Sequence, residues 1–316
     1  MQDFLLLHII FFAHCLLSSS LTDIPKMPNM IKSIERHFIF GYGSLMCHRS
    51  RAITSPSLAL KPAIPVVVEH LSRTWSARIS HKKNIEKDAN IATTEIDGQT
   101  AMGIERVRNK KCSGVLIEVD TLELKHFDAR EGGYDRVEID LRHVWGLVDE
   151  LDGEAHAVLQ QASYKRTSSQ LKQEVDDSDV ETMKVWVYIP QTSLPANRNY
   201  PIVQSYVDII VRGCLEYNTD FVTHFLNTTH GWWYHHNAAA DIDQSRTNIN
   251  DGEFNHFVWV EDRGDPLYVR ADMDWSKNMA GLVDQYLKEH LPLAFTKRKP
   301  LDLVLSASEK YVEEFD

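Results

Sequence analysis

The sequence has few cysteines, and no two of them form a Cys-x-x-Cys pair. Four are present in 316 residues, and Cys47, Cys112 and Cys214 are the three that follow the first segment. A disulfide framework is therefore not expected, and this part of the chain is typical of a protein in a reducing compartment. Internal repeats and low-complexity tracts are also missing, which excludes collagen-like and other repetitive classes of protein.

The sequence also lacks a run of basic residues. Its 34 Lys and Arg residues face 45 Asp and Glu residues, which gives a formal net charge of −11 and a pI near 5.7. A field of this sign repels polyanions, so nucleic acid is not an expected partner. The composition, 43% hydrophobic and 25% charged, is that of a globular protein with a sizeable core. A small-molecule partner is expected.

Long apolar runs are confined to one place, from Phe4 to Leu17. This is shorter than the roughly 20 residues of a membrane span. Small residues follow it, as in a secretory signal, but Asp3 stands where a positive charge is expected. Two interpretations stay open: residues 1–30 are a signal-like leader or anchor, or they precede a start at Met27 or Met30. Membrane contact is expected only for an uncleaved anchor, and the location is cytoplasmic or organellar unless the secretory route is used.

Short runs of β-branched and aromatic residues predict a strand-rich core. A basic turn over 109–111 predicts that the third and fourth of these runs form a hairpin. Thr121 is a suitable N-cap for one helix, and Gly132-Gly133 is expected to end it. We therefore expect an α+β fold. The predicted strands are His37–Phe40, Ile64–His70, Ala101–Val107, Ser113–Val119, Tyr134–Leu141 and Val185–Ile189.

Two polar stretches interrupt this core, which spans residues 36–190. Residues 82–100 have few large apolar side chains and are predicted to form a mobile loop. Residues 165–182 are rich in Asp and Glu and are predicted to be a disordered acidic insertion.

The last third of the chain, residues 200–316, is predicted to be an extension that packs on the core. Apolar residues from Ile202 to Tyr217 share one helical face, with Pro201 at the first helical position. A second helix is expected over 281–291. The segments between these helices are rich in aromatic residues, so the extension is predicted to be helical and aromatic.

The segment Phe40-Gly41-Tyr42-Gly43-Ser44-Leu45 places a glycine-rich turn directly after a predicted strand. Successive N–H groups in such a turn form a nest that binds an anion. The lysine of a P-loop and the third glycine of a dinucleotide fingerprint are both missing, which favours a carboxylate ligand over a phosphate. The alternative is that the glycines only make a tight turn.

The segment Arg130-Glu131-Gly132-Gly133-Tyr134 contains the second candidate. A carboxylate in the last turn of a helix faces the negative end of the helix dipole, which penalises its ionised form. The pKa of Glu131 should therefore rise toward that of a general base. The alternative is a solvated residue before a glycine C-cap.

Taken together, these two motifs resemble the γ-glutamylcyclotransferase superfamily, particularly its ChaC-type members. The resemblance covers Phe38 to Ile189, and Leu71–Trp75 resembles the Arg- and Trp-bearing second strand of that family. The turn between the Arg-Glu pair and the following Gly-Tyr is shorter here than in the ChaC pattern. The resemblance implies a small mixed β-barrel with flanking helices. It also implies cofactor-free release of 5-oxoproline from a γ-glutamyl compound.

The resemblance also implies roles for individual residues. Glu131 would accept a proton from the α-amine of the substrate as that amine attacks its own γ-carbonyl. Tyr134 would either hydrogen-bond the substrate or pack against the core. The substrate would be bound through the backbone N–H groups of Tyr42, Gly43, Ser44 and Leu45.

Two rival chemistries are less favoured by the sequence. Histidines gather at positions 224, 230, 235 and 236, but without the spacing of a known metal motif. Cys47 lies close behind the glycine turn without an identifiable histidine partner, so packing is the expected role. Three functions remain open: a cyclotransferase acting on glutathione or γ-glutamyl peptides, one acting on γ-glutamylamines, or a non-catalytic binding protein with the same fold.

Overall fold

A computed structural model describes residues 35–81, 96–146, 158–160, 163, 182–232 and 259–304. The predicted leader (1–30), most of the predicted loop (82–100) and nearly all of the acidic insertion (165–182) lie outside these residues. Within the described residues, none of the helices has the length and apolar character needed to span a membrane.

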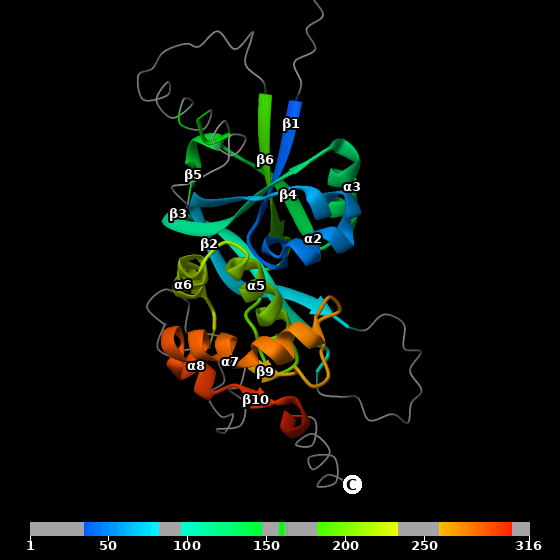
Figure 1. Ribbon diagram of the computed structural model, residues 1–316, viewed down its shortest axis with the longest axis vertical. Coiled ribbons are helices and arrows are strands. Elements are labelled where there is room, and N and C mark those ends of the chain that lie inside the picture. Colours follow the sequence, from blue (N-terminus) through cyan, green and yellow to red (C-terminus); the bar gives the residue numbers. More distant parts are fainter. Residues whose placement is uncertain are drawn as a thin grey trace, which may run out of the picture. The chain divides into compact units, whose positions relative to one another are not determined.

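A mixed sheet of seven strands forms the core of the described chain (Figure 1). Its order is β4-β6-β1-β3-β2-β5, and β8 also pairs with β2. The pairs β1/β6 and β2/β8 are parallel, and the others are antiparallel. The strands are β1 (Glu35–Gly41), β2 (Ile64–Ser80), β3 (Gly98–Val119), β4 (Tyr134–Ile139), β5 (Val144–Gly146), β6 (Thr182–Pro190) and β8 (Thr229–His230).

The sheet curls into a half-barrel with helices against it, which confirms the predicted α+β fold and its mixed sheet (Figure 1). The helices pack mainly through buried aliphatic and aromatic side chains that continue the core of the sheet. They are η1 (Ser44–Met46), α2 (His48–Thr54), η2 (Pro56–Leu60), α3 (Thr121–Arg130), η3 (Leu141–His143), α5 (Gln204–Leu215), α6 (Thr219–Thr228), α7 (Met273–His290) and α8 (Pro292–Thr296).

The predicted hairpin over 101–119 is wrong, because both of its arms belong to the single strand β3. β2 is long enough to pair with both arms, from Ile64 opposite Leu116 to Ser80 opposite Gly98. The register shifts between Glu69 and Leu71, and the basic residues form an irregularity there instead of a turn. Gly98 to Thr100 also belong to β3 and not to the predicted loop.

Helix α3 begins one residue earlier than expected. Asp120, not Thr121, is the N-cap, and its carboxylate accepts hydrogen bonds from the N–H groups of Leu122 and Glu123. The Glu123 carboxylate accepts in return from the Asp120 N–H at 2.8 Å, which completes a capping box. The helix ends at Arg130, so Glu131 is its C-cap.

The helix predicted from Pro201 begins instead at Gln204. The preceding strand β7 (Ile202–Val203) pairs with β9 (Trp259–Glu261), which also pairs with β10 (Lys299–Pro300). The residues predicted to form the first helical turn pair with a distant strand instead, so the helix begins later. The C-terminal region thus contains a small parallel sheet in addition to the predicted helices, and the helix expected over 281–291 is the second half of α7.

Helix α5 connects the region of the seven-stranded sheet with the C-terminal region of the described chain. It contacts η1 on one side and α7 on the other, with α6 beside it (Figure 1). A Cβ atom on Gly213 would lie only 2.4 Å from the backbone nitrogen of Cys47. Glycine at this position therefore lets α5 lie directly against the backbone that follows the glycine turn.

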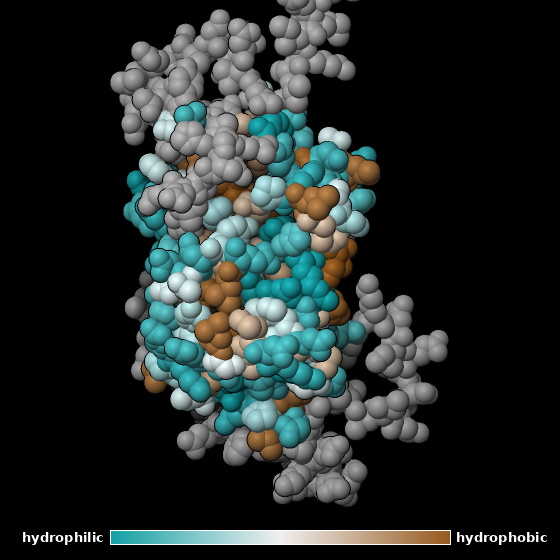
Figure 2. All heavy atoms as spheres, in the orientation of Figure 1, coloured by the Kyte–Doolittle hydropathy of each residue, from teal (hydrophilic) through white to brown (hydrophobic). Residues whose placement is uncertain are grey.

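The surface of the described residues is mostly polar. On the face shown in Figure 2, hydrophobic spots are surrounded by hydrophilic side chains. The more exposed large hydrophobic side chains include Leu60, Val269, Leu293 and Leu303, which come from separate elements. Scattered exposure of this kind is ordinary for a globular protein.

Candidate active site

The glycine turn lies where β1 meets helix α5. A Cβ atom on Gly43 would lie 3.0 Å from the Tyr206 hydroxyl and 3.1 Å from the Cβ of Met102. A side chain at this position would therefore crowd α5 and β3. The N–H groups of Met46 and Cys47 bond back to the carbonyls of Gly43 and Ser44, while the first N–H groups of such a turn have no partner within it.

Two hydrogen bonds of Tyr42 fix the position of the glycine turn. The Tyr42 hydroxyl donates to the Tyr188 carbonyl at 2.5 Å. The Tyr42 carbonyl accepts from Nη1 of Arg73 at 3.2 Å. Strands β6 and β2 therefore both determine where the turn backbone lies.

Arg73 is completely buried, and its hydrogen bonds with described residues all go to neutral oxygen atoms. Besides Tyr42, its guanidinium donates to the carbonyls of Ser113 (2.8 Å) and Phe225 (3.2 Å) and to the Thr229 hydroxyl (2.8 Å). It also stacks on the Phe225 ring at 4.2 Å. Arg73 thus ties the glycine turn to β3 and to the end of α6, a role that the sequence did not indicate.

Glu131, the C-cap of α3, lies near the glycine turn. Its side chain is only 17% exposed, and its carboxylate lies 2.9 Å from Nε of Arg130. Burial raises the pKa of Glu131, and the nearby Arg130 and Arg270 guanidinium groups offset only part of that rise. The pKa of Glu131 is raised, as its position at the helix terminus predicted, but the largest cause of the rise is removal of the carboxyl group from water.

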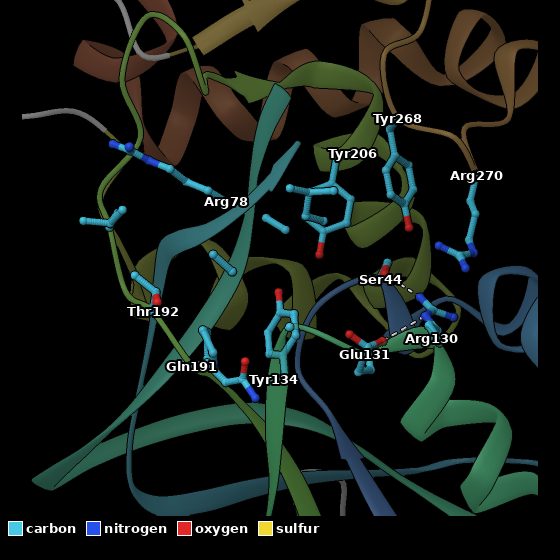
Figure 3. Close-up of a pocket in the computed structure, with 16 residues that line it drawn as sticks. Ser44, Arg78, Arg130, Glu131, Tyr134, Gln191, Thr192, Tyr206, Tyr268 and Arg270 are labelled. Carbon is cyan, nitrogen blue, oxygen red and sulfur yellow. Dashed lines mark hydrogen bonds and ion pairs between the residues drawn. The ribbon is translucent and has the colours of Figure 1, made fainter. Parts of the chain in front are cut away.

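Arg130 joins Glu131 to the glycine turn. Its Nη2 donates to the Ser44 hydroxyl at 2.9 Å, and its Nη1 donates to the Ser50 carbonyl at 3.1 Å and the Thr54 hydroxyl at 2.5 Å. One guanidinium therefore holds the ends of α3, α2 and η1 together (Figure 3). Its place beside Glu131 in the motif was the only sequence signal for this role.

Ser44, Glu131, Tyr134 and Tyr206 line two neighbouring cavities. The first, which we call the turn chamber, is small. Its remaining lining residues come mainly from the glycine turn and its supports: Phe40, Tyr42, Gly43, Leu45, Met102 and Tyr188. The structure thus brings all the predicted site residues, Glu131, Tyr134 and the turn from Tyr42 to Leu45, to one place.

The second cavity, the main chamber, has a volume of about 440 Å³. Its walls come from β2, β4, the segment after β6, and the C-terminal region (Figure 3). Among its lining residues are Arg78, Gln191, Thr192, Tyr268 and Arg270, which the sequence analysis did not single out. None of these positions lies in either motif, so no local signal marked them.

Two phenol groups face each other across the site (Figure 3). The Tyr134 hydroxyl donates to the Met102 carbonyl at 3.2 Å. Burial and the neighbouring tyrosine and Glu131 raise the pKa of Tyr134 well above its ordinary value. Burial, Tyr268 and Glu131 likewise raise the pKa of Tyr206. Both phenols therefore stay protonated and can act in neutral hydrogen bonds with a ligand.

Other reactive side chains lie apart from this arrangement. Cys47 is buried, and burial raises the pKa of its thiol, which disfavours the nucleophilic thiolate. His224 and His230 belong to no metal-like group within the described residues. His235 and His236 lie outside those residues.

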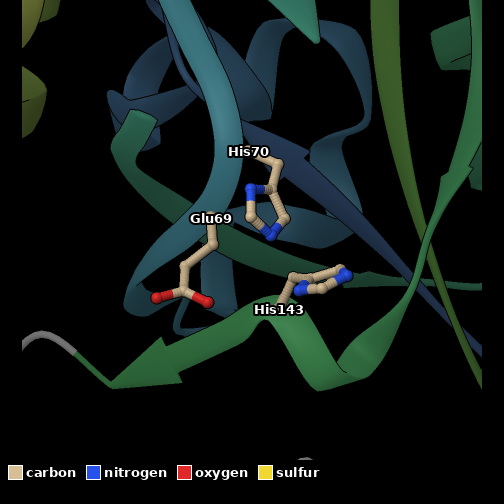
Figure 4. Close-up of side chains that lie close together, drawn as sticks. All are labelled: Glu69, His70 and His143. Carbon is tan, nitrogen blue, oxygen red and sulfur yellow. The ribbon is translucent and has the colours of Figure 1, made fainter. Parts of the chain in front are cut away.

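Glu69, His70 and His143 have their polar atoms within 4.8 Å of one another, at β2 and the adjoining η3 (Figure 4). The backbone N–H of Asn109 donates to Nδ1 of His70 at 3.1 Å. A neutral imidazole that accepts at Nδ1 carries its proton on Nε2, so Nε2 is not free to bind a metal. Glu69 also pairs with Lys111 at 3.4 Å. These contacts favour a structural role for the cluster.

Comparison with known proteins gave matches only among solved structures. No protein-family model and no curated protein matches the chain. A structure titled gamma-glutamyl cyclotransferase is 14% identical, with a TM-score of 0.36, covering 60% of this chain and 86% of its own. An uncharacterized protein from Homo sapiens gives the same values.

A yeast γ-glutamyl cyclotransferase specific to glutathione is 15% identical, with a TM-score of 0.28, covering 49% of this chain and 69% of its own. The similar solved structures thus include γ-glutamyl cyclotransferases. Because the identities are near 15% and these TM-scores lie below 0.5, we base the function on the site itself.

Proposed function

We propose that this chain is a γ-glutamyl cyclotransferase, which converts a γ-glutamyl compound into 5-oxoproline and a free amine. The observation that carries the proposal is the Arg130 bridge. Arg130 pairs with the buried carboxylate of Glu131 and donates to the Ser44 hydroxyl, which holds that carboxylate beside the glycine turn. Glu131 and Ser44 line the same cavities. The two motifs from which we inferred the reaction are thus parts of one site.

Glu131 acts as the general base of the proposed reaction. The α-amine of a γ-glutamyl substrate has a pKa of about 8, so it is mostly protonated at neutral pH and cannot attack. Because burial raises the pKa of Glu131, its carboxylate accepts the ammonium proton more readily than an exposed one would. The ion pair with Arg130 keeps the carboxylate oriented toward the cavity.

The bond changes occur within one substrate molecule. The α-nitrogen forms a bond to the γ-carbonyl carbon and closes a five-membered ring, and the original amide C–N bond breaks. Two protons move in total from the attacking nitrogen to the leaving nitrogen, with Glu131 as the carrier. Atoms and charge balance without an oxidant or a reductant.

The remaining requirement is orientation of the substrate. Holding a near-attack conformation can supply about 7–11 kcal/mol of the barrier. The N–H groups of the turn from Tyr42 to Leu45 bind the α-carboxylate of the γ-glutamyl group. The protonated phenol of Tyr206 then offers a hydrogen bond to the amide that is cleaved, and the Tyr134 hydroxyl, which donates to the Met102 carbonyl, can accept one.

The decisive experiment measures 5-oxoproline directly. The purified full chain is incubated separately with glutathione, γ-glutamyl dipeptides and γ-glutamylamines. We expect 5-oxoproline from at least one class, and none above background with Glu131→Gln. Failure of the folded protein to form 5-oxoproline from every class contradicts the proposal and favours a non-catalytic binding protein.

A further inference from the structure

The wall of the main chamber includes a short segment from the C-terminal region, between β9 and α7. Tyr268 and Arg270 of this segment line the cavity. The Tyr268 ring packs against Tyr206 with 4.6 Å between ring centroids. The segment thus adds an aromatic ring and a positive charge to the site.

A buried carboxylate fixes the start of the segment. Asp262 is 1% exposed. Its Oδ1 accepts from the Ser205 N–H at 2.7 Å, and its Oδ2 accepts from the Ser205 hydroxyl at 2.6 Å and the Leu267 N–H at 2.8 Å. The Tyr268 N–H also donates to the Ser205 hydroxyl at 3.3 Å. The segment is therefore bound to the first turn of α5.

A second carboxylate fixes its end. Asp272 caps α7 and pairs with Arg212 of α5 at 2.6 Å and with Arg49 of α2 at 3.1 Å. The Ala271 N–H bonds back to the Tyr268 carbonyl at 2.9 Å. Arg270 thus lies between two anchored points, which limits the conformational entropy lost when it binds a ligand.

Arg270 makes no direct ion pair within the part of the chain that the structure describes, although it is near enough to Glu131 to lower the pKa of that carboxyl group. No ion pair joins it to a described acidic residue, and its Nε is buried without a hydrogen-bond partner there. Glu131, the acidic residue of the cavity, already pairs with Arg130. The Arg78 guanidinium points away from the cavity and donates to the Pro195 carbonyl at 2.9 Å (Figure 3).

Arg78 likewise has no ion pair with a described acidic residue, but its guanidinium is directed out of the cavity, so Arg270 is the cation placed to favour an anionic ligand group there. A carboxylate matches a guanidinium in both charge and planar geometry. In the proposed function, the turn binds the α-carboxylate of the γ-glutamyl part, and we place the leaving group farther from the turn, in the larger main chamber. The carboxylate available at that position is the one on the leaving group.

We infer that Arg270 binds a carboxylate of the leaving group and makes the site selective for γ-glutamyl amino acids and peptides over γ-glutamylamines. This inference rests on the proposed function. It assigns to the C-terminal region a part in substrate choice, and it makes Arg270 a specificity-determining residue that takes no part in the bond changes.

A matched pair of substrates tests the inference. γ-Glutamyl-L-alanine and γ-glutamylethylamine differ only by the carboxylate of the leaving group. At pH 8, we expect the unmodified protein to prefer the alanine compound by roughly 10- to 100-fold in kcat/KM, the range of a charge-assisted hydrogen bond. Arg270→Gln should remove that preference, through a higher KM for the alanine compound. Lys277→Gln, which removes an exposed charge on α7, should change neither.

Two outcomes overturn the inference while leaving the proposed function intact. If Arg270→Gln lowers kcat/KM equally for both substrates, Arg270 acts on the γ-glutamyl part. If it changes neither, Arg270 does not bind substrate.

Calorimetry with Glu131→Gln separates this inference from the reaction itself, because it needs no turnover. Tighter binding of the alanine compound, lost in the Glu131→Gln/Arg270→Gln double variant, supports the inference even if the unmodified protein forms no 5-oxoproline. Equal binding of the two compounds contradicts it.

Discussion

The Arg130 guanidinium lies 2.9 Å from the carboxylate of Glu131, the next residue in the chain. The same guanidinium reaches Ser44 on the glycine turn. An ion pair normally lowers the pKa of a carboxylate, yet the pKa of Glu131 is raised, because burial outweighs the attraction. The pair therefore orients the base without removing its basicity.

Replacing the base should abolish turnover and preserve the fold. Glu131→Gln keeps the size of the side chain but cannot accept a proton, so we predict a 10²- to 10⁴-fold loss of kcat, the usual contribution of general base catalysis. Release of 5-oxoproline measures the loss, and a thermal melt checks folding. Glu138→Gln, the same change at an exposed position on β4, is the control. Undiminished turnover in Glu131→Gln would refute the mechanism.

The acid limb of the pH–rate profile should report Glu131. Only the ionised carboxylate is a base, so kcat/KM should fall as the pH drops through its pKa, with a midpoint above 4.5 because burial raises that pKa. Arg270 opposes the rise, so Arg270→Gln should move the midpoint to still higher pH. Lys277→Gln should leave it in place. A midpoint at or below 4.5 contradicts this assignment.

Arg130 should behave as a positioning residue. Arg130→Lys keeps the charge but cannot reach Glu131, Ser44 and Thr54 at once, because lysine lacks the planar fork. We predict a drop in kcat of about 10-fold or more in a protein that still folds, with a lower melting temperature because the bonds to Ser50 and Thr54 are also weakened. Arg136→Lys, at an exposed ion pair with Asp128, controls for the substitution itself. Equal kcat values for the two variants would exclude a positioning role.

Gly43 should tolerate no side chain. In Gly43→Ala, the new Cβ would lie 3.0 Å from the Tyr206 hydroxyl, so the turn must shift and kcat/KM should fall at least about 10-fold. Gly281→Ala, which has open space around it in α7, should be neutral or slightly stabilising. Full activity in Gly43→Ala would show that the turn does not contact substrate.

The capping box should stabilise α3 in a pH-dependent way. Burial by itself would raise the pKa of Glu123, but hydrogen bonds with Lys61, Ser57 and the Asp120 N–H lower it below its ordinary value. A lowered pKa means that ionised Glu123 stabilises the fold above pH 4.5, and that this stabilisation is lost as the pH falls through the lowered pKa.

Glu123→Gln should therefore reduce the free energy of unfolding by about 1–2 kcal/mol at pH 7, as expected for a lost helix cap. Denaturant unfolding at pH 7 and at pH 3 measures the difference, which should shrink at the lower pH. A pH-independent difference would mean that the charge of Glu123 does not contribute.

The sequence by itself determined the features that depend on neighbouring residues. The strand that runs into the glycine turn is found as predicted, and the predicted helix is found as well, although it ends at Arg130 and leaves Glu131 as its C-cap instead of in its last turn. The glycine turn and the helix end were recognisable because each needs only a few adjacent residues, and the roles of base and binding turn came from the resemblance of the two motifs to a known family. Two predictions were wrong, the helix start at Pro201 and the hairpin over 101–119. In both places the backbone pairs with a strand that is distant in the sequence.

Only the tertiary structure decided what surrounds those local motifs. Arg270 lies 139 positions after Glu131 in the chain, yet the Asp262 and Asp272 carboxylates hold its segment in the wall of the same cavity. The pKa rise of Glu131 is likewise due mainly to burial, which depends on how the elements pack. Contacts of this kind arise from packing between segments far apart in the chain, so no pattern of adjacent residues predicts them.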